Sequence, residues 1–170
     1  MAITRLGGAT AITGTIPQGN IANASLGAVT ALPGAIPTGK VLQVVTDVLS
    51  TETGTTSTSY VEVSGFAATI TPSSTSSKIL VLCSASSYVN VANNYLGTIY
   101  RGSTDLGTFG RLFSAAAGLG SIFNFNFLDS PSTTNATTYT YYHKVGSGTG
   151  YVSVNDYKSN LTLMEIAGWL

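Results

Sequence analysis

The feature that most constrains the fold of this 170-residue chain is a succession of short apolar runs separated by Gly, Ser, Asn and Pro. Residues 123–127 read Phe-Asn-Phe-Asn-Phe, which places three rings on one face of an extended strand and two amides on the other. Turn signals recur at roughly 8–12-residue intervals, as in β-sandwiches and jelly rolls. The sequence therefore predicts an all-β protein.

A β-sandwich or jelly-roll-like head of about 8–9 short strands is expected over residues 40–170. The runs that support it are 41–45, 59–63, 66–70, 78–89, 95–101, 104–109, 123–127, 139–145, 151–154 and 161–167. Gly146–Gly150 is expected to be a Gly-rich hairpin loop between two of these runs. Leu112–Leu119 is the one helix candidate in this part of the chain.

Residues 1–39 form a different kind of segment, without aromatic residues and with an internal repeat. Residues 13–19 read Thr-Gly-Thr-Ile-Pro-Gln-Gly and residues 33–39 read Pro-Gly-Ala-Ile-Pro-Thr-Gly, and an Ile before Pro favours extended backbone. We expect an extended N-terminal arm that anchors the protein or mediates trimerisation; the alternative is a passive linker. The candidate anchoring or trimer contacts are Ile12, Ile16, Ile21, Leu26, Val29, Leu32 and Ile36.

The charge content argues against several classes of function. Only 8% of residues are charged and the net charge is zero, so no basic surface for nucleic acid is expected. No run approaches the roughly 20 apolar residues needed to span a bilayer, and the N-terminus lacks the apolar core of a secretory signal. Ser and Thr make up more than a quarter of the chain, so hydroxyls and amides are expected to supply its polar surface.

Catalytic and metal-binding patterns are also missing from the sequence. His143 is the one histidine, and only Asp129 and Asp156 are candidates to orient it as a general base. One His and one Cys give no zinc spacing, and Cys83 lies in an apolar run where a buried thiol is expected. We therefore expect no enzyme activity, no cofactor and no metal.

The nine tyrosines include a local cluster that has two interpretations. Tyr139, Tyr141, Tyr142 and His143 could form an outer contact surface for a carbohydrate or a protein. Alternatively, these aromatic side chains pack across neighbouring strands, as aromatic residues in sheets commonly do.

Three segments resemble small virion proteins of tailed bacteriophages, notably phages of cyanobacteria and marine bacteria. Residues 39–45 read Gly-Lys-Val-Leu-Gln-Val-Val, and residues 58–66 read Thr-Ser-Tyr-Val-Glu-Val-Ser-Gly-Phe, followed by Ile-Thr-Pro-Ser-Ser-Thr-Ser-Ser-Lys-Ile-Leu-Val at 70–81. The third segment, residues 161–167, reads Leu-Thr-Leu-Met-Glu-Ile-Ala. The resemblance covers roughly residues 39–170 and concerns the fold, since it carries no site motif.

The resemblance implies a trimeric virion structural protein that is made in the host cytoplasm and located on the virion exterior. We expect a capsid decoration protein, of the cement or head-fibre type, whose arm binds the major capsid protein or another virion protein. The alternative is a tail-fibre or receptor-binding tip that recognises a host surface glycan. The expected partners are other copies of the chain and virion proteins, with no nucleic acid and no membrane.

Overall fold

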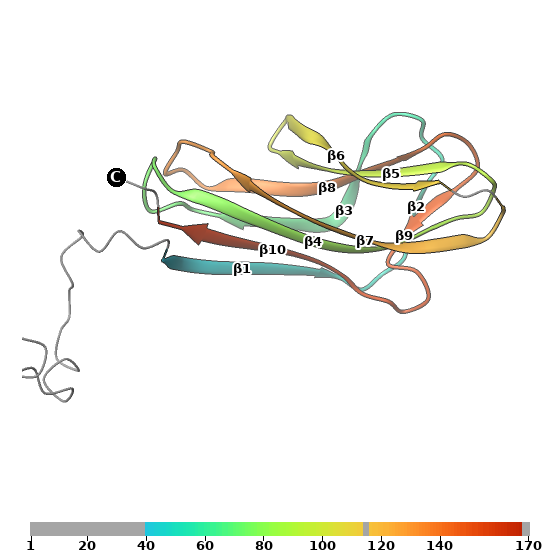
Figure 1. Cartoon of the computed structure of the whole chain (residues 1–170), viewed down its shortest axis with the longest axis horizontal. Helices are drawn as coiled ribbons and strands as arrows, with labels where there is room; N and C mark the ends of the chain where they lie inside the picture. The colour runs from blue at the N-terminus through green and yellow to red at the C-terminus, as the bar shows by residue number, and fades with distance from the viewer. Residues whose placement is uncertain (1–39, 114–115, 168–170) are drawn as a thin grey trace, which may run out of the picture. The chain divides into compact units, whose positions relative to one another are not determined.

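A computed structural model describes residues 40–113 and 116–167, which form ten antiparallel strands in two sheets (Figure 1). The strands are β1 (Val41–Leu49), β2 (Thr53–Thr55), β3 (Val61–Ile70), β4 (Lys78–Val89), β5 (Asn94–Arg101), β6 (Thr104–Phe113), β7 (Leu119–Asp129), β8 (Thr137–Val145), β9 (Gly150–Val152) and β10 (Ser159–Ile166). The predicted all-β sandwich is confirmed.

The first sheet is built around β4, the longest strand. Along one edge, β4 pairs with β7 from Ile79–Asp129 to Val89–Leu119. Along its other edge, β4 pairs first with β10 and then, near its end, with β9. β1 pairs with the outer edge of β10, and β2 with the outer edge of β9. The sheet is therefore four strands wide at both ends, because β1 and β10 cover one half of β4 while β2 and β9 cover the other.

The second sheet has the order β3-β8-β5-β6 and covers the inner face of the first (Figure 1). β8 lies in its interior, between β3 and β5. β3 continues through Gly65, which has a φ of 77° and lies within a register shift between Glu62 and Ala67. The two runs expected at 59–63 and 66–70 are thus one bulged strand, because glycine takes this backbone conformation readily.

The core between the sheets is rich in aromatic side chains. As the alternation in residues 123–127 predicts, Phe123 and Phe125 are buried on the inner face of β7, whereas the intervening Asn124 is exposed. Phe123 stacks on Tyr95 at 5.7 Å between ring centroids, and Phe125 stacks on Tyr141 at 6.3 Å. These pairs join β7 to strands of the opposite sheet.

Two local predictions were wrong. The Gly146–Gly150 segment is not a hairpin loop, since β8 belongs to the second sheet while β9 pairs with β4 and β2 in the first. It carries the chain across the sandwich. The proposed helix at Leu112–Leu119 is also not found: its first two residues end β6, and Leu119 begins β7. The described residues, 40–113 and 116–167, contain no helix.

A buried carboxylate fastens the turn between β3 and β4 to the first sheet. Glu165 on β10 is fully buried. Its Oε1 accepts hydrogen bonds from the Ser73 amide at 2.7 Å and from the Ser73 and Ser77 hydroxyls, each at 2.6 Å. Its Oε2 accepts a 2.6 Å bond from Gln43 Nε2 on β1. Glu165 therefore ties together β10, β1 and the 72–77 turn.

Candidate assembly surface

Four apolar side chains lie side by side on the outer face of the first sheet. Val44 on β1 is directly opposite Met164 on β10, Met164 is opposite Leu80 on β4, and Leu80 is opposite Leu128 on β7. Because successive side chains of a strand point to opposite faces, all four project away from the core. We call Val44, Leu80, Leu128 and Met164 the apolar row.

The apolar row is open to solvent at both ends and half-covered in its middle. Val44 is 56% exposed and Leu128 is 55% exposed, whereas Leu80 and Met164 are partly buried between them. An isolated exposed leucine is ordinary on a protein surface. Four apolar residues in register across four strands form a continuous patch, and such patches mark contact surfaces.

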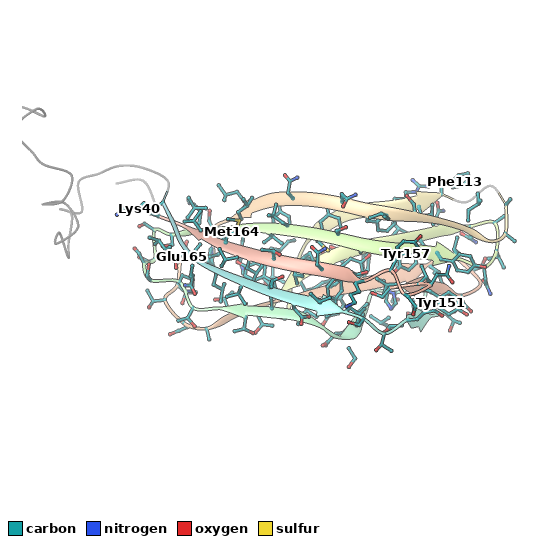
Figure 2. The ribbon with its side chains drawn as sticks, turned by 90° about the horizontal axis from the view of Figure 1, so that it is seen from below. Lys40, Phe113, Tyr151, Tyr157, Met164 and Glu165 are labelled. Carbon is teal, nitrogen blue, oxygen red and sulfur yellow. The ribbon has the colours of Figure 1, made fainter. Side chains whose placement is uncertain are left out.

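The outer face becomes more polar with distance from the row. The rank of residues two positions along the strands contains Thr46 and Thr162, whose hydroxyl oxygens are 3.0 Å apart, and Asn126, with Leu82 between Thr162 and Asn126. On the other side of the row, Leu42 is 45% exposed. Figure 2 shows Met164 at the same end of the sandwich as Lys40, where residues 1–39 join the head. The apolar part of the face therefore lies next to the start of β1.

His143 and Asp129, two of the residues considered for general acid–base chemistry, have hydrogen-bond partners in the structure. Both carboxylate oxygens of Asp129 accept hydrogen bonds from Arg101 at 2.7 Å, and its Oδ2 also accepts one from Tyr139 Oη at 2.6 Å. The buried His143 Nδ1 lies 2.8 Å from Tyr95 Oη, and burial lowers the pKa of its imidazole to about 4. His143 therefore has a structural partner in the core, and Asp129 has structural partners at the edge of the sandwich.

Cys83 is buried, as its apolar run predicts, and burial raises the pKa of its thiol. Within residues 40–113 and 116–167, no group of three or more His, Cys, Asp or Glu side chains is arranged to hold a metal ion. In the same part of the chain, no helix is long and apolar enough to cross a membrane.

The residues predicted as arm contacts lie outside the described part of the chain. These are Ile12, Ile16, Ile21, Leu26, Val29, Leu32 and Ile36. Their contacts remain a prediction.

The predicted outer contact surface needs a correction. Tyr139, Tyr141 and His143 are buried on the inner face of β8, with exposures of 0%, 0% and 1%. The face of β8 that carries these three side chains packs against the first sheet, where Tyr141 stacks on Phe125. Only Tyr142 projects to the outer face, where its ring stacks on Tyr100 at 4.0 Å between centroids. The alternative, cross-strand packing of this cluster, describes these residues better.

Reasoning from the sequence missed the apolar row. Each of its members lies in a predicted strand run or one residue beyond it, and each is an ordinary strand residue. What makes them a site is the register of four strands that are distant in the sequence, and the sequence carried no signal for that register.

Comparisons with known proteins give limited results. No family model matches the chain, and no curated protein matches it. Matching solved structures include the T13 viral particle of infectious bursal disease virus, with 14% identity and a TM-score of 0.44 over 75% of this chain and 36% of that chain. A second match is the Gt strain of the same virus, with 14% identity and a TM-score of 0.42 over 75% of this chain and 38% of that chain. A third is the T=1 particle of its D431N mutant VP2 protein, with 15% identity and a TM-score of 0.41 over 75% of this chain and 37% of that chain. This chain spans little more than a third of the matched chains.

Proposed function

We propose that the protein is a virion structural protein: a homotrimeric capsid decoration subunit on the virion exterior, held to the particle by its N-terminal arm. The observation that carries the proposal is the apolar row on the outer face of the first sheet, beside the start of β1. A non-enzymatic role is consistent with the hydrogen bonds of His143 and Asp129, because both side chains already have partners within the protein.

The size of the row supports a joint role with the arm. A stable interface buries about 800 Å² on each partner, and four side chains that are already half-covered supply only part of that. The seven spaced aliphatic residues of the arm, from Ile12 to Ile36, would supply further apolar area. A closed trimer brings three rows and three arms together around one axis, which leaves no open-ended contact.

The low charge of the chain suits display on a particle exposed to varying salt. Surface ion pairs weaken as ionic strength rises, whereas hydroxyl and amide groups stay hydrated. Three of the four residues in each of the next two ranks of the outer face follow this pattern. These are Thr46, Thr162 and Asn126 beside Leu82, and Ser84, Asn124 and Asn160 beside Val48.

The proposal is tested with full-length variants. Val44→Ser combined with Leu128→Ser removes the two exposed ends of the row. The matched control, Val48→Ser combined with Leu119→Ser, changes side chains that are 46% and 48% exposed outside the row. Native mass spectrometry is expected to show trimers for the wild type and the control, and at least a tenfold loss of trimer for the row variant.

The arm has its own test, which uses binding to purified particles. Removing residues 1–39 is expected to abolish particle binding while the far-ultraviolet circular dichroism of the β-sheets is kept. Undiminished particle binding would refute anchoring by the arm. Trimers that persist in the row variant would refute the role of the row.

A second candidate is a tail-fibre or receptor-binding tip that recognises a host surface glycan. The partly exposed Tyr142, stacked on Tyr100, favours it, because aromatic rings are common in contact surfaces. The two candidates differ in copy number: a decoration protein is present in hundreds of copies per particle, and a fibre tip in a few tens or fewer.

A further inference from the structure

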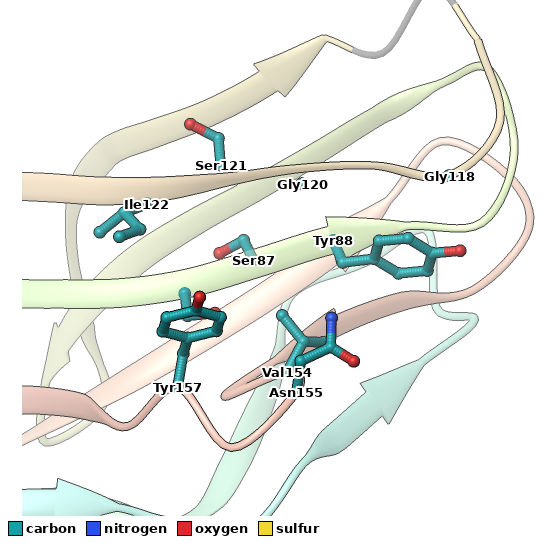
Figure 3. A pocket seen from close by; sticks show the side chains of 10 residues that line it. Ser87, Tyr88, Gly118, Gly120, Ser121, Ile122, Val154, Asn155 and Tyr157 are labelled. Atoms are coloured by element: carbon teal, nitrogen blue, oxygen red, sulfur yellow. The ribbon is translucent and has the colours of Figure 1, made fainter.

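A hollow opens on the first sheet between β4, β7 and the loop that joins β9 to β10. It has a volume of about 310 Å³, within the range of small-ligand sites. Figure 3 shows the ring of Tyr157 and that of Tyr88 on different sides of the hollow, with Ile122 and Asn155 also beside it. Tyr157 is 65% exposed and Ile122 is 55% exposed. The hollow therefore combines an open aromatic face with apolar and amide neighbours.

A second hollow of about 380 Å³ shares Tyr88, Val154 and Asn155 with the first. Tyr151 lines its far side and lies 5.8 Å from Tyr88 between ring centroids. The two hollows are thus neighbours, and three tyrosines line them in succession. We call Tyr157, Tyr88 and Tyr151 the tyrosine tract.

The loop that carries Tyr157 is fastened in one conformation. Ser153, Asn155 and Asp156 have φ values of 58°, 53° and 63°, a region that non-glycine residues enter rarely. The Ser153 hydroxyl lies within hydrogen-bond distance of the Leu49 carbonyl oxygen, at 3.0 Å, and of Ser159 Oγ, at 2.9 Å. A site held in place before binding loses less conformational entropy when a ligand arrives.

The polar groups of the first hollow are uncharged, and three of them are available to a ligand. Among the described residues that line it, none carries a formal charge at neutral pH, and they include three serines, two tyrosines and one asparagine. The side chains of Ser121, Asn155 and Tyr157 form no hydrogen bond with another described residue. An anion would find no cation in this hollow, and a cation would find no carboxylate. The matching ligand is a neutral molecule rich in hydroxyl groups.

We propose that the tyrosine tract binds a neutral oligosaccharide. The C–H face of a sugar ring packs on the electron-rich face of a tyrosine, while its hydroxyls exchange hydrogen bonds with serine hydroxyls and an asparagine amide. Each hollow accepts one sugar unit, with Tyr88 and Asn155 between them. Glu52 lines the second hollow and accepts hydrogen bonds from sugar hydroxyls while disfavouring acidic sugars.

The tyrosine tract would stay accessible to a ligand if the protein were anchored through its N-terminal arm. Figure 2 shows Tyr151 and Tyr157 away from the end of the sandwich that holds Lys40 and Met164. Sugar binding is a property of the head itself. It therefore does not depend on the proposed place of the protein on a particle, and it is measured on the purified chain.

The experiment uses the full-length chain and a panel of neutral hexasaccharides of glucose, galactose and mannose, with sialylated and sulfated oligosaccharides as charged counterparts. Saturation-transfer NMR and titration calorimetry are expected to identify at least one neutral oligosaccharide with a Kd of about 1 mM or tighter. Tyr157→Ala is expected to weaken its binding at least about tenfold, because the exposed ring supplies the stacking face. Asn155→Gly keeps the positive φ while removing the amide, and is expected to weaken binding about fivefold.

Two controls separate the tract from other tyrosines and from the hydroxyl group. Tyr142→Ala, on the outer face of the second sheet, is expected to leave the Kd unchanged, and Tyr157→Phe is expected to stay within about threefold of the wild type. The proposal is overturned if no neutral oligosaccharide binds, if charged oligosaccharides bind as tightly, or if Tyr157→Ala retains wild-type affinity. Loss of binding in Tyr142→Ala alone would instead place a glycan site on the second sheet.

Discussion

Replacing Glu165 by Gln is expected to destabilise the head, because this carboxylate joins three parts of the first sheet. Burial alone would raise the pKa of the Glu165 carboxyl, but hydrogen bonds from Gln43, Ser73 and Ser77 outweigh that effect and lower the pKa from 4.5 to about 2. A downward shift of that size is worth at most about 3.5 kcal/mol, at about 1.4 kcal/mol per pH unit. Because the carboxylate of the unfolded chain has hydrogen bonds to water instead, we expect roughly 1.5–2.5 kcal/mol of this to appear as stability.

The pH dependence follows from the sign of the shift. A carboxyl whose pKa is lower in the folded than in the unfolded state stabilises the fold above the unfolded value. That stabilisation is lost as pH falls through the folded value. For Glu165 the contribution is complete above pH 4.5 and disappears toward pH 2. In the Gln variant an amide NH₂ also faces the donor Gln43 Nε2, which already donates to the Thr71 carbonyl oxygen at 2.7 Å.

The assay is urea unfolding followed by circular dichroism at one fixed protein concentration, from pH 7 to pH 2.5. The free energy of unfolding of Glu165→Gln is expected to be lower than that of the wild type by roughly 1.5–2.5 kcal/mol at pH 7, and this difference should shrink below pH 4.5. Glu62→Gln serves as the control, because Glu62 is exposed on β3. A variant within about 0.5 kcal/mol of the wild type at pH 7 would refute this reasoning, and so would a difference that stays constant to pH 2.5.

Three further predictions concern the core. Phe125→Ala is expected to lower the free energy of unfolding by about 3–5 kcal/mol, whereas Asn126→Ala, on the opposite face of β7, should change it by less than about 0.5 kcal/mol in the same urea assay. Because burial lowers the pKa of His143 from 6.5 to about 4, the stability that depends on its neutral form is complete above pH 6.5 and lost toward pH 4; a His143→Gln variant should flatten this part of the pH profile. Cys83 is expected to resist a maleimide reagent in the folded chain and to react once urea unfolds it, and rapid labelling of the folded chain would contradict its burial.

Local patterning made most of the strands predictable. The run at 78–89 coincides with β4, and the Phe-Asn alternation at 123–127 gave the correct inner and outer faces of β7. Both signals are periodicities of adjacent residues, which depend on the backbone of one strand alone. β2 was missed because its three residues, Thr-Gly-Thr, include no apolar side chain to indicate a strand.

Relations between distant segments were not predictable. Tyr139, Tyr141 and His143 are as compatible with an exposed face as with a buried one, and only the packing of the first sheet on that face of β8 decides it. The loop at 146–150 has a composition typical of hairpins, yet it crosses between the sheets because β9 pairs with β4.

The candidate surfaces depend on the same missing information. The apolar row requires the register of β1, β10, β4 and β7, and no short stretch of sequence holds it. The tyrosine tract combines β4, β9 and the loop after β9, so Tyr88 is far in the chain from Tyr151 and Tyr157. The sequence did indicate that hydroxyls, amides and tyrosines dominate this surface, which is the chemistry that both hollows present.

The central claim, that this chain is a capsid decoration subunit, is tested most directly by counting its copies in purified virions. Quantitative mass spectrometry would compare peptides of this chain with peptides of the major capsid protein of the particle to which the proposal assigns it. Decoration predicts hundreds of copies per particle, in a fixed ratio to the capsid protein. A few tens of copies or fewer would contradict decoration in favour of a fibre tip, and absence of the chain from virions would contradict a structural role in the particle.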